Sequence, residues 1–172
     1  MKPIVATAAF ILMFCLTLPV LAQGTKPSDT GVAPENRVKI MPPGPGFKAI
    51  AGDTNGAYSL AENRRDPGGG VDPHTHSIED ESFYVIEGFF VFQVGDRRIE
   101  APAGTFVFGP RGVRHSYKNE GTTAGRLLVL SSPGGFEKFL AERQALEKQL
   151  SKTDPAYPER WKALQQKYGM QY

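Results

Sequence analysis

Short apolar runs alternate with turn signals along the middle of the chain, and this pattern predicts β-strands. The runs are rich in Phe, Val and Ile, which fit a pleated, half-buried surface. The expected strands are Phe47–Ala51, Ala57–Glu62, Glu81–Glu87, Phe89–Val94, Thr105–Phe108 and Arg126–Ser131. Glycine- and proline-rich turns such as Asp66–Gly70 separate them. Strands at this spacing predict an all-β fold, an antiparallel sandwich or barrel, over residues 47–132.

The hydrophobic period changes after residue 132 and becomes helical. Apolar residues recur at helical spacing with Glu and Lys between them, at Phe136, Phe139, Leu140, Leu146 and Leu150. A second short helix is predicted from Pro158 to Tyr168, because a proline opens it and Gly169 closes it. We expect this helical extension, residues 133–172, to pack against the barrel or against a partner subunit.

The beginning of the chain has the pattern of a targeting segment. One lysine, an apolar stretch and small residues around Ala22 predict a cleavable signal peptide over residues 1–22. An uncleaved anchor helix is the alternative, and Pro19 favours cleavage. Residues 23–46 are polar and rich in proline, so we expect a flexible arm there. The protein is therefore expected to be periplasmic or secreted, with no membrane contact after cleavage.

Composition narrows the possible functions. A length of 172 residues suits one domain, and 20 basic residues against 18 acidic ones provide no electrostatic argument for binding nucleic acid. The one cysteine, Cys15, lies in the predicted signal peptide. The mature chain would then have neither disulfides nor thiolate ligands, and its core alone would have to stabilise it.

The candidate chemistry lies in the three histidines, His74, His76 and His115. Residues two apart on a strand face the same side, so His74 and His76 can point into one site. Glu81 has the wrong parity to continue that strand, so residues 77–80 are expected to form a turn. If the strand of His115 pairs nearby, three imidazoles and one carboxylate converge, which suits a divalent transition metal.

Less specific interpretations exist for each of these groups. A histidine taken alone is most often not a ligand, and residues 79–81 taken alone read as a solvated acidic turn. We select Glu81 because it begins an apolar strand, on which Phe83 and Val85 share its face. A carboxylate facing inward needs a cationic partner, which a metal supplies.

With these residues the sequence resembles the cupin superfamily. That family's first motif is matched by Gly68, His74, His76, Glu81 and Gly88, and its second by Gly104, Pro110, Gly112, His115 and Asn119. The resemblance implies a double-stranded β-helix, or jelly-roll, barrel that binds one metal through His74, His76, Glu81 and His115. The metal would be Fe, Mn, Ni, Co, Cu or Zn. Cupins commonly pair, and the arm and helices could reach a neighbour, so a homodimer is one expected assembly.

A finer resemblance concerns bacterial cupins related to quercetin 2,3-dioxygenase, and rests on residues 79–88, 132–137 and 167–169. It implies a metal-dependent dioxygenase in which Glu81 acts as general base on a small aromatic or flavonol-like substrate. The expected substrate pocket is Phe83, Val85, Phe106, Phe108 and Tyr117, and the alternative interpretation of these residues is ordinary barrel core. A non-enzymatic metal- or ligand-binding cupin and a metal-dependent lyase or isomerase stay open as alternatives.

Overall fold

The structure is a computed structural model that describes residues 39–172. The predicted signal peptide, residues 1–22, lies outside the described residues, as do residues 23–38 of the predicted arm. Residues 39–45 precede the first strand and contain neither helix nor strand. Among residues 39–172, no helix combines the length and apolar character needed to cross a membrane.

Strands occupy most of the described chain up to Ser132, and helices follow. The elements are β1 (Gly46–Ala49), β2 (Ser59–Arg65), β3 (Gly70–His76), β4 (Asp80–Glu87), β5 (Phe89–Val94), β6 (Arg97–Pro102), β7 (Phe106–Gly109), β8 (His115–Asn119), β9 (Gly125–Ser132), α1 (Phe136–Gln149), α2 (Tyr157–Lys167) and β10 (Met170–Gln171).

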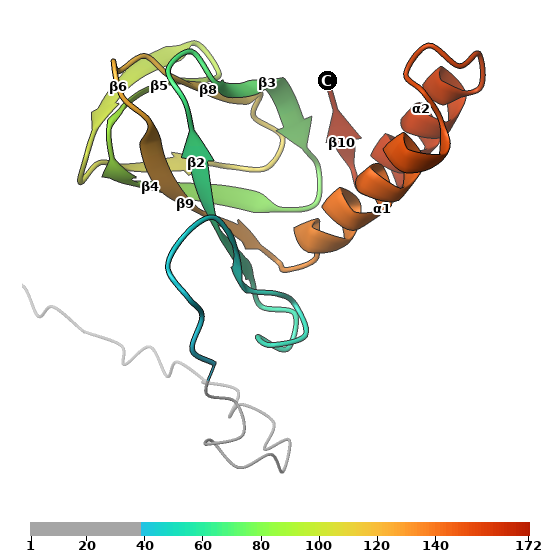
Figure 1. Cartoon of the computed structure of the whole chain (residues 1–172), viewed down its shortest axis with the longest axis horizontal. Coiled ribbons are helices and arrows are strands. Elements are labelled where there is room, and N and C mark those ends of the chain that lie inside the picture. The colour runs from blue at the N-terminus through green and yellow to red at the C-terminus, as the bar shows by residue number, and fades with distance from the viewer. Residues whose placement is uncertain (1–38) are drawn as a thin grey trace, which may run out of the picture. The chain divides into compact units, whose positions relative to one another are not determined.

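Two antiparallel sheets form the barrel (Figure 1). Within residues 39–172 one sheet has the order β1-β2-β9-β4-β7 and the other the order β10-β3-β8-β5-β6. The predicted all-β jelly-roll class, with a C-terminal pair of short helices, is confirmed. Two strands were not predicted. One is β6, which pairs with β5, and the other is the two-residue β10, which pairs with β3.

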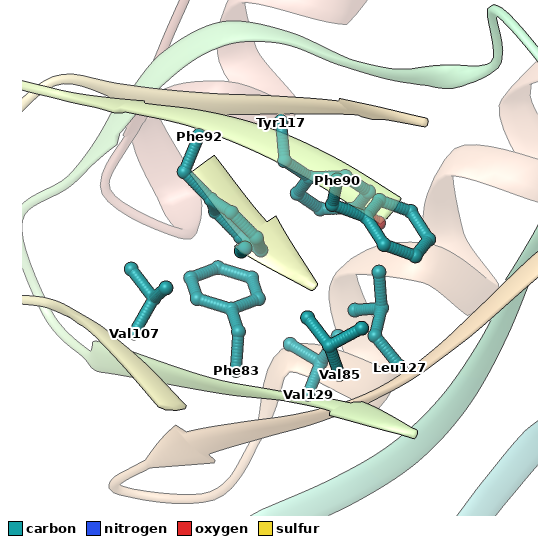
Figure 2. Packing of buried hydrophobic residues seen from close by; sticks show 9 residues of the cluster. Phe83, Val85, Phe90, Phe92, Val107, Tyr117, Leu127 and Val129 are labelled. Atoms are coloured by element: carbon teal, nitrogen blue, oxygen red, sulfur yellow. The ribbon is translucent and has the colours of Figure 1, made fainter. Parts of the chain in front are cut away.

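The hydrophobic core lies between the two sheets, where inward-facing side chains of both meet (Figure 2). Its buried members are Phe83, Val85, Phe90, Phe92, Ala101, Val107, Tyr117, Leu127 and Val129. The ring centroids of Phe83 and Phe92 are 5.1 Å apart, and those of Phe92 and Tyr117 are 5.4 Å apart. Strand β9 alternates buried and half-buried residues throughout, as a strand with one inward face should.

The prediction that Phe106 and Phe108 line a substrate pocket is wrong. Their exposed fractions are 62% and 52%, because β7 turns Val107 inward instead. The register decides this: Val107 lies opposite Phe83 of β4, and residues directly opposite share a face. Since Phe83 faces the core, both neighbours of Val107 must face outward. Val85 is fully buried in the core.

We expect Phe83→Ala to lower the free energy of unfolding by about 3–5 kcal/mol, because it empties a fully packed position of the core. Phe106→Ala is the matched control, and it should change stability by no more than about 0.5 kcal/mol, since that ring is exposed. Chemical denaturation of both variants measures the difference. Equal losses of stability in the two variants would contradict the assignment of Phe83 to the inward face of β4 and of Phe106 to the outward face of β7.

The helical extension forms its own apolar cluster beside the barrel. The buried residues of this cluster are Phe139, Leu146, Tyr157, Leu164 and Met170. The observed α2 lies within one residue of the predicted helix, and Gly169 follows it with a positive φ of 64°. That turn sends β10 back along the edge strand β3, where Met170 lies opposite His76 (Figure 1). The end of the chain is thereby held next to two of the histidines.

Candidate metal centre

The structure brings together the four side chains that sequence analysis selected. His74 and His76 lie on β3, Glu81 on β4 and His115 on β8. One ligand atom from each lies within 4.8 Å of all the others, and all four residues are buried. The chain bends at residues 77–79, between β3 and β4, as the parity of Glu81 required.

The donor atoms face a common point. The Nε2 atoms of His74 and His76 are 3.0 Å apart, and the Nε2 of His115 is 3.2 Å from Oε2 of Glu81. The same Oε2 atom is 3.5 Å from Nε2 of His76. A metal ion that binds nitrogen at about 2.1 Å keeps adjacent ligand atoms roughly 3.0–3.4 Å apart. The 3.0 and 3.2 Å separations lie in this range, and the 3.5 Å separation is close to it.

Hydrogen bonds on the far side of each imidazole orient its Nε2 atom. Nδ1 of His74 donates to the carbonyl oxygen of Asp72 at 2.7 Å, and Nδ1 of His115 donates to that of Val113 at 3.0 Å. A carbonyl oxygen can only accept, so in the neutral tautomer both histidines present an unprotonated Nε2 to the cluster. These outer partners preset the ligands for a metal.

His76 has a carboxylate as its outer partner. Its Nδ1 lies 3.0 Å from Oε1 of Glu79, which is itself buried. Sequence analysis missed this role and read Glu79 as part of a solvated acidic turn. The bend after β3 instead brings the carboxylate of Glu79 back to the imidazole of His76. The available signal was the proximity of an acid to a ligand histidine, and such acids commonly orient metal-bound imidazoles.

The electrostatics distinguish the individual ligands. Burial disfavours the charged form of His76, but its hydrogen bonds to Glu79 and Glu81 outweigh burial and raise its pKa to about 9. His74 lacks a carboxylate hydrogen bond, and burial lowers its pKa to about 4. Burial opposes ionisation of Glu81, yet the imidazoles of His115 and His76 beside it lower the pKa of its carboxyl. Glu81 is therefore an anion, and a divalent cation at this point would compensate its charge.

Gly112 of the second motif and Gly70, the first residue of β3, each hold strands of the site together. The amide of Gly112 donates to the carbonyl oxygen of His76 at 2.7 Å, and its φ of 77° is the left-handed conformation that glycine tolerates best. This bond ties the turn before β8 to the end of β3. A Cβ atom on Gly70 would lie 2.1 Å from the carbonyl oxygen of Tyr117, so only glycine allows β3 to approach β8 this closely.

Arg111, in the turn before β8, and Asn119, at the end of β8, have structural partners. Arg111 forms an ion pair with Asp80, with Nη2 2.8 Å from Oδ2. The pair fastens the β7–β8 turn to the start of β4 and faces away from the histidines. Asn119, the last residue of the second motif, donates through Nδ2 to the carbonyl oxygens of Arg65 and Thr123. It holds loops together and contacts none of the four ligands.

A cavity of about 150 Å³ adjoins the four ligands inside the barrel. Its walls are Asn63, Arg65, Val71, His74, Glu81, Phe83, Tyr117, Val129, Phe136, Phe139, Leu140, Arg143 and Tyr172. Of the predicted pocket residues, Phe83 and Tyr117 line this cavity. The ring of Tyr172 stacks on His74 at 5.5 Å and that of Phe136 meets His76 edge-on at 5.4 Å. The C-terminal extension therefore covers the site, a role that sequence analysis did not assign to it.

We expect Glu79→Gln to weaken divalent-metal affinity about 10- to 100-fold, because His76 loses the carboxylate that orients it and raises its basicity. Competition with a chromophoric chelator measures the affinity. Glu87→Gln, at an exposed position of the next strand, is the control and should leave the affinity unchanged. An unaltered affinity in Glu79→Gln would contradict the role given to this carboxylate.

Comparison with known proteins places this site in a family. Residues 64–131, which include all four candidate ligands, match the family described as Cupin domain. No curated protein sequence matches the chain. A solved structure described as a predicted oxalate decarboxylase from Thermotoga maritima is 30% identical, with 46% of this chain and 70% of that chain covered and a TM-score of 0.45.

Two further solved structures are similar to the chain. An RmlC-like cupin from Shewanella frigidimarina is 25% identical, with 48% of this chain and 72% of that chain covered and a TM-score of 0.44. KdgF from Halomonas sp. is 18% identical, with 55% and 81% covered and a TM-score of 0.50, a likeness of fold alone. The family match over both histidine motifs, together with 30% identity over 70% of the Thermotoga maritima chain, shows that this chain belongs to the cupin superfamily.

Proposed function

We propose that this cupin is a metal-dependent enzyme of dioxygenase type that acts on a small organic substrate. The observation that carries the proposal is the cavity beside the ligands, whose wall includes both His74 and Glu81. An ion with a purely structural role is enclosed by its protein ligands and needs no adjacent space. A catalytic ion keeps positions open toward a substrate.

The four ligands suit such an ion because neutral imidazoles and a carboxylate bind divalent transition metals. When bound, the ion would supply Lewis-acid and redox chemistry to a substrate oxygen. Iron, manganese, nickel, cobalt or copper would fit the oxidative proposal. Stoichiometric zinc would instead favour the lyase, isomerase or structural alternatives.

Glu81 is the candidate general base of this site. Its carboxylate lines the cavity, and its Oε1 accepts a hydrogen bond from Oγ of Ser131 at 3.2 Å. It is thus held within reach of a substrate proton while His76 and His115 contact its other oxygen, Oε2. Apolar rings such as Phe83 and Phe136 exclude water from the same space.

The cavity size restricts the substrate. A volume of about 150 Å³ corresponds to roughly five molecules of liquid water at about 30 Å³ each. Pockets for drug-sized ligands are about 300–1,000 Å³. A three-ring flavonol would therefore require Tyr172 and Phe136 to move, whereas a small acid or carbonyl compound requires no such movement.

We further propose that the protein works outside the cytoplasm. The support is the pattern of residues 1–22, in which a lysine and an apolar stretch precede small residues at Ala22. N-terminal sequencing of the protein recovered from the export compartment tests this proposal, and a chain that begins near residue 23 is the expected result.

The catalytic proposal is tested by elemental analysis of protein purified without a metal-affinity tag, followed by an oxygen electrode with a panel of small acids and carbonyl compounds. About one redox-active ion per chain and substrate-dependent oxygen uptake are expected. The His115→Ala protein is the control and should show neither. Turnover without oxygen uptake would indicate a lyase or isomerase, and binding without turnover would indicate a non-enzymatic cupin.

A further inference from the structure

Arg65 lines the cavity beside the metal ligands and has a buried nitrogen without a hydrogen-bond partner. It is the last residue of β2 and lines the cavity together with His74 and Glu81. Its neighbour Arg64 points the other way and forms an ion pair with Asp66, with Nη1 2.9 Å from Oδ1. The alternation of β2 therefore places one arginine outside the barrel and one inside it.

The guanidinium of Arg65 has no anionic partner within residues 39–172. Its Nε atom is buried without a hydrogen-bond acceptor, and its Nη1 donates to a backbone carbonyl oxygen, that of Arg64, at 3.0 Å. A buried N–H group without an acceptor costs free energy, and the cost is larger when the group is charged. A bound anion would remove that cost.

Tyr117 supplies a second donor beside Arg65. The guanidinium carbon of Arg65 lies 5.9 Å from the centre of the Tyr117 ring. Nδ2 of Asn63 donates to the Tyr117 hydroxyl oxygen at 3.3 Å, which leaves the hydroxyl hydrogen available to another acceptor. Asn63, Arg65 and Tyr117 all line the cavity.

The position of Arg65 is fixed by the fold. Its carbonyl oxygen accepts a hydrogen bond from Nδ2 of the fully buried Asn119 at 2.9 Å, and its Cα lies opposite Gly125 of β9. A second cation, Arg143 of α1, lines the same cavity but already donates to Glu147 at 3.1 Å. Arg143 therefore has a carboxylate partner, whereas Arg65 has none among the described residues.

We propose that the cavity selects a small carboxylic acid, whose carboxylate binds Arg65 and the hydroxyl of Tyr117 while a second oxygen of the same molecule faces the metal ligands. This inference rests on the proposed function, because a bound metal is what the second oxygen would meet. An uncharged carbonyl compound could offer an acceptor to Arg65 but no negative charge to balance its guanidinium, and an aromatic ring alone would offer neither. The charge of the substrate, rather than an aromatic ring, would then determine selectivity.

The test uses three oxo acids that differ in the number of carbons between carboxylate and ketone: pyruvate, acetoacetate and levulinate. Each is titrated calorimetrically into the metal-loaded full chain, and the amide of the tightest acid is the uncharged comparison. The fluorescence of Trp161 provides a second readout, because its ring lies 5.8 Å from that of Tyr172, which lines the cavity. At least one acid should bind tenfold or more tightly than its amide. Equal binding of acid and amide would overturn the proposal.

Variants assign the effect to Arg65. Arg65→Gln should raise the dissociation constant of the best acid at least tenfold, with unchanged metal content and a melting temperature no lower than that of the wild type. Arg65→Lys, which keeps the charge but loses the fork of donors, should give an intermediate value. Arg64→Gln, the same change one residue away and outside the cavity, should bind the acid like the wild type. Wild-type affinity in folded Arg65→Gln would refute the proposed subsite.

The same titrations are repeated on chelator-treated protein, which separates the two proposals. If the protein never retains a metal, the catalytic proposal fails. Acid binding to the metal-free protein that Arg65→Gln weakens would still support the anion subsite. If metal is retained and no acid is preferred over its amide, the subsite fails and the metal centre stands.

Discussion

His76→Ala is expected to reduce the affinity for a divalent metal by more than about a hundredfold, which exceeds the effect of losing an outer hydrogen bond. His76 contributes a ligand nitrogen 3.0 Å from that of His74 and 3.5 Å from the carboxylate of Glu81. Its removal leaves two imidazoles and one carboxylate. Elemental analysis of the purified variant should find much less than one ion per chain.

Stability provides an independent measurement. A metal at 1,000 times its dissociation constant stabilises the folded wild type by about 4 kcal/mol, because it binds the folded chain and not the unfolded one. His76→Ala should lose most of this metal-dependent increase in melting temperature. Thr75→Ala, one residue earlier and facing the other side of β3, should retain it. Full metal content in His76→Ala would show that the four residues are not the ligand set.

Glu81→Gln is the second large effect that we expect. The substitution keeps the size of the side chain but removes the negative charge and the ability to take up a proton. It should reduce turnover by about 10²–10⁴-fold if Glu81 is the general base, beyond the reduction explained by lost metal. Both quantities are therefore measured on the same sample, with turnover expressed per bound ion.

Asp80→Asn is the matched control for Glu81→Gln, since it is the same chemical change at the adjacent residue. Asp80 faces outward, pairs with Arg111 and contacts none of the four ligands. Its variant should retain turnover per ion, with at most a small loss of stability from an exposed ion pair. If Glu81→Gln also leaves turnover per bound ion unchanged, Glu81 is not the general base and acts only as a metal ligand.

Much of the site could be predicted from sequence because its information is local. His74 and His76 are two residues apart on a strand, and the parity of Glu81 required the bend that the structure has at residues 77–79. Placing His115 beside His74 and His76 needed the family pattern, because the sequence of the His115 strand does not indicate which strand pairs with it. The structure puts His115 directly opposite His74.

The predictions about the pocket failed where two alternatives had the same local pattern. In β7 the residues at positions 106, 107 and 108 are all apolar, so alternation could not decide which of them faces inward. Pairing with β4 decided it in favour of Val107. Glu79 was missed for a related reason, because its burial follows from the direction of a bend and not from a periodic pattern.

The sequence by itself determined the β-barrel class, the helical extension and the identity of the candidate ligands, because strand alternation, helical period and motif spacing are properties of neighbouring residues. Tertiary structure alone decided what surrounds those ligands. Arg65 enters the cavity from β2, Phe136 from α1 and Tyr172 from beyond α2, which are segments far apart along the chain. Such contacts depend on sheet register and helix packing, and no local pattern encodes them.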